Sequence, residues 1–165
     1  MAITLHLLHA NPQPPFYRAL QGYFDEHAIT NPSPQIVRQA VVAIRSSKLP
    51  DPRTIPNNGS FFANPIISQE DTVQLLGSYP DMPHWPQDDG RVKLPAAWLV
   101  DQAGFKDVHD SETGIGTWPA QALVLVNEHA QTTQQLLTFR QKIIDAVQQR
   151  FGIILEQEPE LLPKE

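Results

Sequence analysis

The sequence predicts an α+β fold, in which about four helices pack on a mostly antiparallel or mixed sheet. Four segments carry apolar residues at helical spacing behind a capping residue or a proline, and three others are rich in β-branched residues, leucine or phenylalanine. Strands and helices do not alternate in a strict βαβ rhythm. The 165 residues suit one compact domain, which we expect to span residues 1–165.

The first predicted elements are a strand and a short apolar segment. Residues 2–8 alternate between two faces, with Ile3, Leu5 and Leu7 on one of them, so the chain is expected to open within a sheet. The prolines that follow remove ladder donors and end this strand. Aromatic and apolar residues recur loosely over residues 16–27, which indicates a short helix or a packed loop.

Two capped helices are predicted next. The first covers residues 34–48, because Ser33 offers an N-cap, a proline follows it, and an apolar stripe that includes Val41 runs along one side. The second covers residues 68–77, where a serine cap and two early acidic residues precede an apolar side that carries Val73.

Two further helices have signals at both ends. Pro95 begins one that meets Gly104 as its C-terminal cap. The longest begins at Thr132, with Gln135 as its capping-box partner, and ends at Gly152.

Three segments are predicted to be strands, namely residues 60–67, 121–127 and 153–155. Residues 122–126 are apolar at every position, so this segment should be a central strand that is covered on both faces.

Composition excludes several classes of function. Twelve Lys and Arg residues against 18 Asp and Glu residues give a net charge of −6, and no basic cluster is present, which argues against nucleic-acid binding. The absence of cysteine removes disulfides, thiolate metal sites and a cysteine nucleophile. No apolar run approaches the roughly 20 residues that span a bilayer, and the N-terminus lacks a signal-peptide pattern. We therefore expect a cytoplasmic protein that does not bind membranes.

Neither a metal site nor a dinucleotide loop is predicted. Six histidines are present, but none forms a helical His-x-x-x-His pair, and His6 and His9 would point to opposite faces of a strand. The Gly-x-Gly at residues 114–116 is short and follows no convincing strand, so we interpret it as a turn.

The segment that ends in Asn64 and Pro65 is a candidate ligand wall. An Asn-Gly turn places Ser60 at the start of a strand, and alternation would put Ser60, Phe62 and Asn64 on one face, with Phe61 on the other. The alternative is structural: Ser60 caps the turn, and Asn64 turns the strand before the proline.

Other polar residues admit the same two readings. Gln121 precedes the apolar strand, and Glu156 and Glu158 would share one face of the closing strand. A solvated carboxylate is the usual alternative. Lys48 ends its helix, where it would complement the helix dipole.

Five segments, taken together and in order, resemble the C-terminal part of the UDP-N-acetylenolpyruvoylglucosamine reductase family, the MurB family. They are residues 46–52 (SSKLPDP), 59–65 (GSFFANP), 93–104 (KLPAAWLVDQAG), 121–127 (QALVLVN) and 151–158 (FGIILEQE). The resemblance implies a flavoenzyme of bacterial peptidoglycan precursor synthesis. FAD would take a hydride from NADPH and pass it to UDP-N-acetylglucosamine enolpyruvate, which gives UDP-N-acetylmuramate.

The resemblance also implies roles for individual residues. Ser60 would donate a proton to C2 of the enolpyruvyl group, and Glu158 would help to polarise its carboxylate region. Trp85 stands where many members carry a tyrosine; its indole can cover the nucleotide without the phenolic hydroxyl. The implied contacts to the nucleotide sugar, with the lysines nearest the diphosphate or carboxylate, are Lys48, Asn64, Lys93, Lys106 and Gln121.

Family members bind FAD in upstream domains, which also contribute an arginine to the active site. The resemblance therefore implies the substrate-binding domain alone, with the FAD-binding domains missing and no cofactor bound, monomeric and inactive in isolation. A UDP-sugar-binding module without redox activity is the alternative, and a scaffold without activity is a third hypothesis.

Overall fold

The structure is a computed structural model that describes residues 3–6 and 9–162. It divides the chain into two compact units, Met1–Lys48 and Leu49–Glu165, and each has its own hydrophobic cluster. The sequence predicts one domain over residues 1–165 instead. The units separate after the second helix because the proline-rich residues 49–56 cannot extend it.

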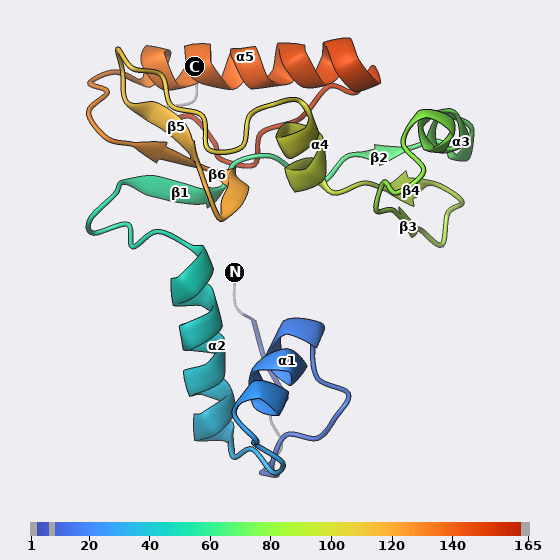
Figure 1. The fold of residues 1–165 in the computed structure, drawn as a ribbon, viewed down its shortest axis with the longest axis vertical. Coiled ribbons are helices and arrows are strands. Elements are labelled where there is room, and N and C mark those ends of the chain that lie inside the picture. The colour runs from blue at the N-terminus through green and yellow to red at the C-terminus, as the bar shows by residue number, and fades with distance from the viewer. Residues whose placement is uncertain (1–2, 7–8, 163–165) are drawn as a thin grey trace. The chain divides into compact units, whose positions relative to one another are not determined.

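The first unit consists of two packed helices, α1 (Arg18–Glu26) and α2 (Pro34–Lys48) (Figure 1). The loosely apolar segment is thus a helix, and the helix over residues 34–48 is confirmed. Their contact buries three side chains and partly covers six others around them; the buried ones are Leu20, Phe24 and Ala40. Val41, which the sequence places on the apolar stripe, is exposed.

The strand predicted over residues 2–8 is wrong for its described part. Residues 1–2 and 7–8 lie outside the described residues, and residues 3–6 form no strand. Ile3 and Leu5 are 82% and 73% exposed. Alternation predicts a face that can be buried, but burial also needs a neighbouring strand, and none of the described residues pairs with this segment.

The second unit contains two antiparallel three-stranded sheets, and the α+β class is confirmed. The larger sheet has the order β1-β6-β5, with β6 in the centre, and the smaller has the order β2-β4-β3. The strands are β1 (Asn57–Ser60), β2 (Ile66–Ile67), β3 (Trp85–Pro86), β4 (Val92–Lys93), β5 (Ile115–Trp118) and β6 (Gln121–Asn127). Residues 122–126 of β6 are all buried, as the sequence predicts for a central strand.

Three helices complete this unit: α3 (Gln69–Ser78), α4 (Ala96–Gln102) and α5 (Thr133–Phe151) (Figure 1). The capping box that Thr132 and Gln135 form is present, and Gly152 ends α5 with a left-handed φ of 71°. Val73 is 60% exposed on α3, although the sequence places it on the apolar side. No helix of the described residues has both the length and the apolar character needed to cross a bilayer.

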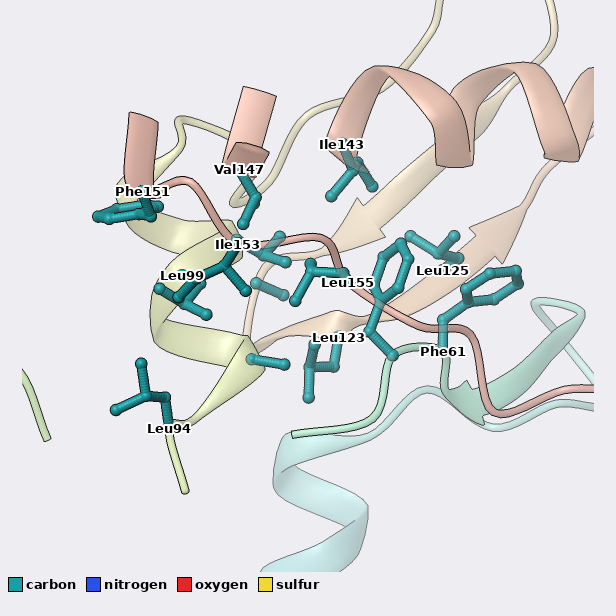
Figure 2. Close-up of a cluster of buried hydrophobic side chains, with 14 of the residues drawn as sticks. Phe61, Leu94, Leu99, Leu123, Leu125, Ile143, Val147, Phe151, Ile153 and Leu155 are labelled. Atoms are coloured by element: carbon teal, nitrogen blue, oxygen red, sulfur yellow. The ribbon is translucent and has the colours of Figure 1, made fainter. Parts of the chain in front are cut away.

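One core lies between α4, α5 and the larger sheet (Figure 2). Leu99 comes from α4, Ile143 and Val147 come from α5, and Leu123 and Leu125 come from β6. Burial of such side chains is the main favourable term in folding, at about 25 cal/mol per Å² of apolar area. The core therefore holds the larger sheet and the segments beside it in a fixed register.

Two strand predictions need correction. The predicted strand over residues 60–67 is split between β1 and β2, which belong to different sheets, because Pro65 cannot donate to a ladder. Residues 153–155 form no strand; among the described residues that follow α5, pairing is limited to one bridge between Gln157 and Phe62.

The strand β5 is absent from the sequence prediction, which interprets residues 114–116 as a turn. Gly114 does turn the chain, but Gly116 lies within β5. The ring of His109 occupies the place that a side chain at Gly116 would need. A close approach of this kind depends on the tertiary structure, so the local sequence could not reveal it.

Candidate active site

The tight turn predicted before Ser60 is wrong in one respect: the Asn-Gly pair lies inside β1, and Ser60 ends this strand instead of starting one. Gly59 does have the predicted positive φ, of 74°, where the register of β1 is irregular, and its N–H donates to Oδ1 of Asn57 at 3.1 Å. Ser60 pairs with Val124 of β6 and remains exposed, whereas Phe61 is buried directly after it. The end of β1 thus presents a hydroxyl to solvent on a segment that the core anchors.

The predicted alternation after Ser60 is wrong. Phe61 and Phe62 are 2% and 1% exposed, so consecutive side chains are both buried, with ring centroids 5.2 Å apart. The register of β1 is irregular, and the chain changes partner at this point, from β6 to the C-terminal segment. A change of partner between two residues lets both rings reach the core.

Backbone hydrogen bonds bring the residues after β1 together with residues 156–158, the acidic segment. The N–H of Phe61 donates to the Leu123 carbonyl at 2.8 Å, and the carbonyl of Phe61 accepts from the Glu158 N–H at 2.9 Å. The N–H of Ala63 donates to the Glu156 carbonyl at 2.9 Å. Glu158 therefore takes part in a backbone contact with Phe61, and Ser60 is the residue before Phe61.

The acidic segment keeps the predicted alternation without forming a regular strand. Ile153 and Leu155 are buried, whereas Glu156 and Glu158 are exposed. Gln157, between the two glutamates, is half-buried. Both carboxylates thus lie on the open side of the segment that borders Ser60.

A side-chain contact joins this segment to α5. Nη1 of Arg140 on α5 donates to Oε1 of Gln157, the residue between the two glutamates, at 2.5 Å. Alternation from residue 153 would have placed Gln157 on the inner face, but nothing in the helical pattern distinguishes Arg140 from the other polar residues of α5.

Asn64 has a structural contact of its own. Its Oδ1 accepts a hydrogen bond at 2.8 Å from the N–H of Ala96, the first residue of α4. This bond satisfies one of the N–H groups that a helix N-terminus leaves without an intrahelical partner. Asn64 also lines, together with Ile66, Phe151 and Glu156, a cavity of about 780 Å³ beside the acidic segment.

The smaller sheet brings Trp85 and Lys93 together. Lys93 is the register partner of Ile66 on one side and of Trp85 on the other, so the three side chains lie in a row on one face. Trp85 is 50% exposed and Ile66 is 44% exposed. This face offers an aromatic surface next to a cation.

The other predicted contacts lie elsewhere. Lys106 follows α4 and pairs with Asp101 at 3.3 Å. Gln121 begins β6, and its Oε1 accepts from the N–H of Leu123 at 3.4 Å. Lys48 is the last residue of α2, in the first compact unit, where its charge complements the helix dipole.

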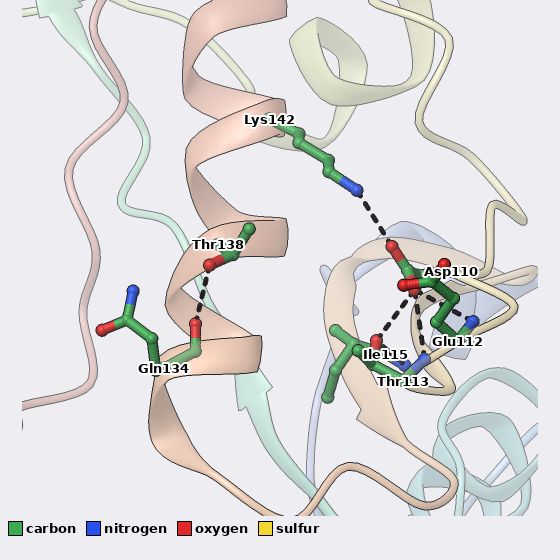
Figure 3. A network of polar contacts seen from close by, with 7 residues as sticks. All are labelled: Asp110, Glu112, Thr113, Ile115, Gln134, Thr138 and Lys142. Atoms are coloured by element: carbon green, nitrogen blue, oxygen red, sulfur yellow. Dashed lines mark hydrogen bonds and ion pairs between the residues drawn. The ribbon is translucent and has the colours of Figure 1, made fainter.

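A polar network fastens the loop that follows Lys106 to α5 (Figure 3). The carboxylate of Asp110 accepts from Nζ of Lys142 at 2.9 Å and from the N–H and hydroxyl of Thr113 at 3.1 Å. These hydrogen bonds, that of Lys142 above all, lower the pKa of Asp110 from 3.8 to about 2.

We expect this network to make stability depend on pH in strong acid. Because the pKa of Asp110 is lower in the folded chain, its contribution is present above pH 3.8 and is lost as the pH falls towards 2. The measurement is the thermal unfolding midpoint between these pH values. Asp110→Asn should flatten the dependence, and Lys142→Met, which removes the partner, should do the same. Parallel curves for all three proteins would contradict the assignment.

The Gly-x-Gly segment at residues 114–116 is not open to a dinucleotide. Side chains occupy the space over the Gly-x-Gly segment, because the ring of His129 lies against Gly114 as that of His109 lies against Gly116. A backbone that is covered in this way cannot approach a pyrophosphate. Within residues 3–6 and 9–162, no group of three His, Asp or Glu side chains is placed to hold a metal ion.

Comparison with known proteins adds a family match. Residues 51–162 match the family model described as UDP-N-acetylenolpyruvoylglucosamine reductase, C-terminal domain. Curated relatives named UDP-N-acetylenolpyruvoylglucosamine reductase include one from Chromobacterium violaceum, 42% identical over 146 residues, which are 88% of this chain and 42% of the relative. Another, from Porphyromonas gingivalis, is 47% identical over 142 residues, which are 86% of this chain and 41% of the relative. The chain thus spans about two fifths of the length of these relatives.

Proposed function

Because this chain belongs to the UDP-N-acetylenolpyruvoylglucosamine reductase family through its C-terminal domain, we propose that it is the substrate-binding part of a UDP-N-acetylmuramate dehydrogenase. The substrate would be UDP-N-acetylglucosamine enolpyruvate, in bacterial peptidoglycan precursor synthesis in the cytoplasm. The observation that carries the proposal is the backbone hydrogen bond between Phe61 and Glu158, because it brings the exposed Glu158 to the residue that follows the exposed Ser60.

The proposed chemistry accounts for the residue types at this site. FAD, reduced by NADPH and held outside this chain, would supply hydride chemistry at C3 of the enolpyruvyl group. Negative charge then develops at C2, next to the substrate carboxylate. The Ser60 hydroxyl donates its proton to C2, which the carbanion character of that atom makes basic enough, and Glu158 orients the carboxylate end of the substrate.

The nucleotide end is proposed to lie on the smaller sheet. Uracil would stack on the exposed indole of Trp85, and the ammonium group of Lys93 would contact the diphosphate as a mobile charge. Asn64 and Gln121 would hydrogen-bond the sugar or uridine, and Lys106 would contact the diphosphate on leaving Asp101. Lys48 would add a further diphosphate or carboxylate contact.

The test of this function begins with binding. We expect calorimetric titration of the chain with UDP-N-acetylglucosamine enolpyruvate to show saturable binding without FAD, since the proposed contacts belong to this chain. The chain alone should not oxidise NADPH. No binding heat, under conditions where the chain is folded, would contradict a substrate-binding role.

A hybrid reductase separates the proposal from a UDP-sugar-binding module. In this hybrid, the chain replaces the matched segment of the Chromobacterium violaceum relative. We expect NADPH oxidation that depends on the enolpyruvyl sugar. Binding by the chain, without turnover in a hybrid that carries bound flavin, would favour the module without redox activity.

The nucleotide contact gives a separate prediction. Trp85→Ala should weaken binding of UDP to the chain about tenfold, because stacking of one base on an aromatic ring contributes about 1–3 kcal/mol. Trp85→Tyr keeps an aromatic face and should bind within about twofold of the original chain. Equal affinities for the alanine and tyrosine variants, measured calorimetrically, would remove the nucleotide from this face.

A further inference from the structure

Backbone and side-chain hydrogen bonds both hold the backbone around Glu158. The N–H of Glu158 donates to the carbonyl of Phe61 at 2.9 Å. Together with the bond from the Ala63 N–H to the Glu156 carbonyl, it forms the bridge between Gln157 and Phe62. The side-chain Nε2 of Gln157 donates to the carbonyl of Pro159 at 2.8 Å, so this side chain reaches across Glu158 and closes a small ring. The Gln157 amide thus helps to fix the backbone from which the Glu158 side chain projects.

Arg140 fixes that amide from another element. Nη1 of Arg140 donates to Oε1 of Gln157, 17 residues further along the chain, which leaves Nε2 of the same amide to face Pro159. A hydrogen bond from a charged donor is stronger than one between neutral groups. The planar guanidinium also has fewer orientations to lose than a flexible ammonium group.

Arg140 itself is half-buried on α5. The residue that accepts from Arg140 is the one between the two exposed glutamates.

We propose that Arg140 is a positioning residue, which acts through Gln157 to hold the backbone of Glu158 in place against Phe61, the residue after Ser60. The proposal rests on the proposed function, because it matters for catalysis only if Glu158 contacts the substrate. Helix α5 is suited to this task, since Phe139 and Ile143, on either side of Arg140, are buried in the core. Arg140 thereby links the rigid core to residues 156–158, which form no regular strand.

The first test uses the 165-residue chain and hydrogen exchange measured by NMR. Arg140→Met and Gln157→Leu should each speed exchange of the Glu158 amide about tenfold, because local opening becomes easier. The Phe61 amide, which donates to Leu123 in the larger sheet, is the internal reference and should change less than about twofold. Unchanged exchange at Glu158, or equal acceleration at both amides, would overturn the inference.

The second test measures turnover in the hybrid reductase. Each single variant should lower kcat about 10–100-fold with a smaller change in KM, because a misplaced catalytic group lowers the rate of the chemical step. The double variant should be no slower than the slower single variant, since both remove the same link. Additive losses would overturn the inference, and so would a Gln157→Leu variant with the original kcat.

A matched control lies on the same helix. Arg150 contacts Tyr79 and the carbonyl of Gln102, and no contact of the described residues joins it to the acidic segment. Arg150→Met should lower the unfolding midpoint while leaving kcat within about twofold. Failure of the proposed function gives a different pattern. If Ser60→Ala turns over normally, the chemistry is wrong, and the exchange of the Glu158 amide still decides the role of Arg140.

Discussion

Replacing Ser60 by alanine in the hybrid reductase is expected to lower turnover of the enolpyruvyl sugar by at least about 100-fold, the usual contribution of a positioned proton donor. NADPH-driven reduction of the flavin should persist, because the Ser60 hydroxyl is needed only in the later half-reaction, after the hydride has passed from the flavin to the substrate. Stopped-flow absorbance of the flavin separates these two half-reactions. The substitution removes one exposed oxygen from a segment whose backbone contacts are unaffected, so the fold should not change.

Ser78 is a suitable control for this experiment. It is an exposed serine at the end of α3, and Ser78→Ala should leave both half-reactions within about twofold of the original rates. Equal loss of both half-reactions in Ser60→Ala would show that Ser60 is a structural residue. Full activity of Ser60→Ala would require another proton donor.

Replacing Phe62 by alanine is expected to have the largest effect on stability. The ring is 1% exposed, meets Phe61 edge to face, and belongs to the core of the second unit. Truncation of a buried phenylalanine costs about 3–5 kcal/mol through lost burial and the cavity that remains. Urea unfolding of the chain should show a loss of this size, a large part of the total stability of a small domain.

Val73 provides the contrast. It is 60% exposed on α3, so Val73→Ala should change the free energy of unfolding by less than about 0.5 kcal/mol. A comparable loss in both variants would mean that burial does not distinguish the two positions. A small loss in Phe62→Ala alone would mean that the core closes over the missing ring.

The helices could be predicted because their signals are local. Thr132, Gln135 and Gly152 define the ends of α5 through contacts within one turn, and the structure has each of them as predicted. Pro34 and Gly104 mark helix ends for similar reasons. Which helical face is buried depends on the partner, and for that reason Val41 and Val73 were placed on the wrong side.

The short strands could not be predicted because their pairing is not local. Strands β2, β3 and β4 have two residues each, which is too few for a periodic pattern. Gly116 belongs to β5 because it pairs with Val126 of β6, which is distant in the sequence from any local signal at residues 114–116. The change of partner at Phe62 is not local either, because the sequence near Phe62 does not show Gln157, its new partner.

The candidate site was predictable only in part. The positive φ of Gly59 before Ser60 is visible in the sequence, and so is the alternation around Glu158. Their proximity comes from a hydrogen bond between distant parts of the chain, and residue patterns alone do not predict it. The family resemblance supplied both residues as a pair, whereas Arg140 was found only from its contact in the structure.

The two-sided bonding of Phe61 has a consequence for engineering this protein. Its N–H donates to Leu123 of β6 and its carbonyl accepts from the N–H of residue 158, so the segment at the end of β1 has a hydrogen-bonded neighbour on each side. Polypeptide shortened to residue 155 would keep all of α5 yet leave the Phe61 carbonyl and the Ala63 amide as an open edge. Affinity tags, cleavage sites and circular permutations therefore belong outside residues 156–158.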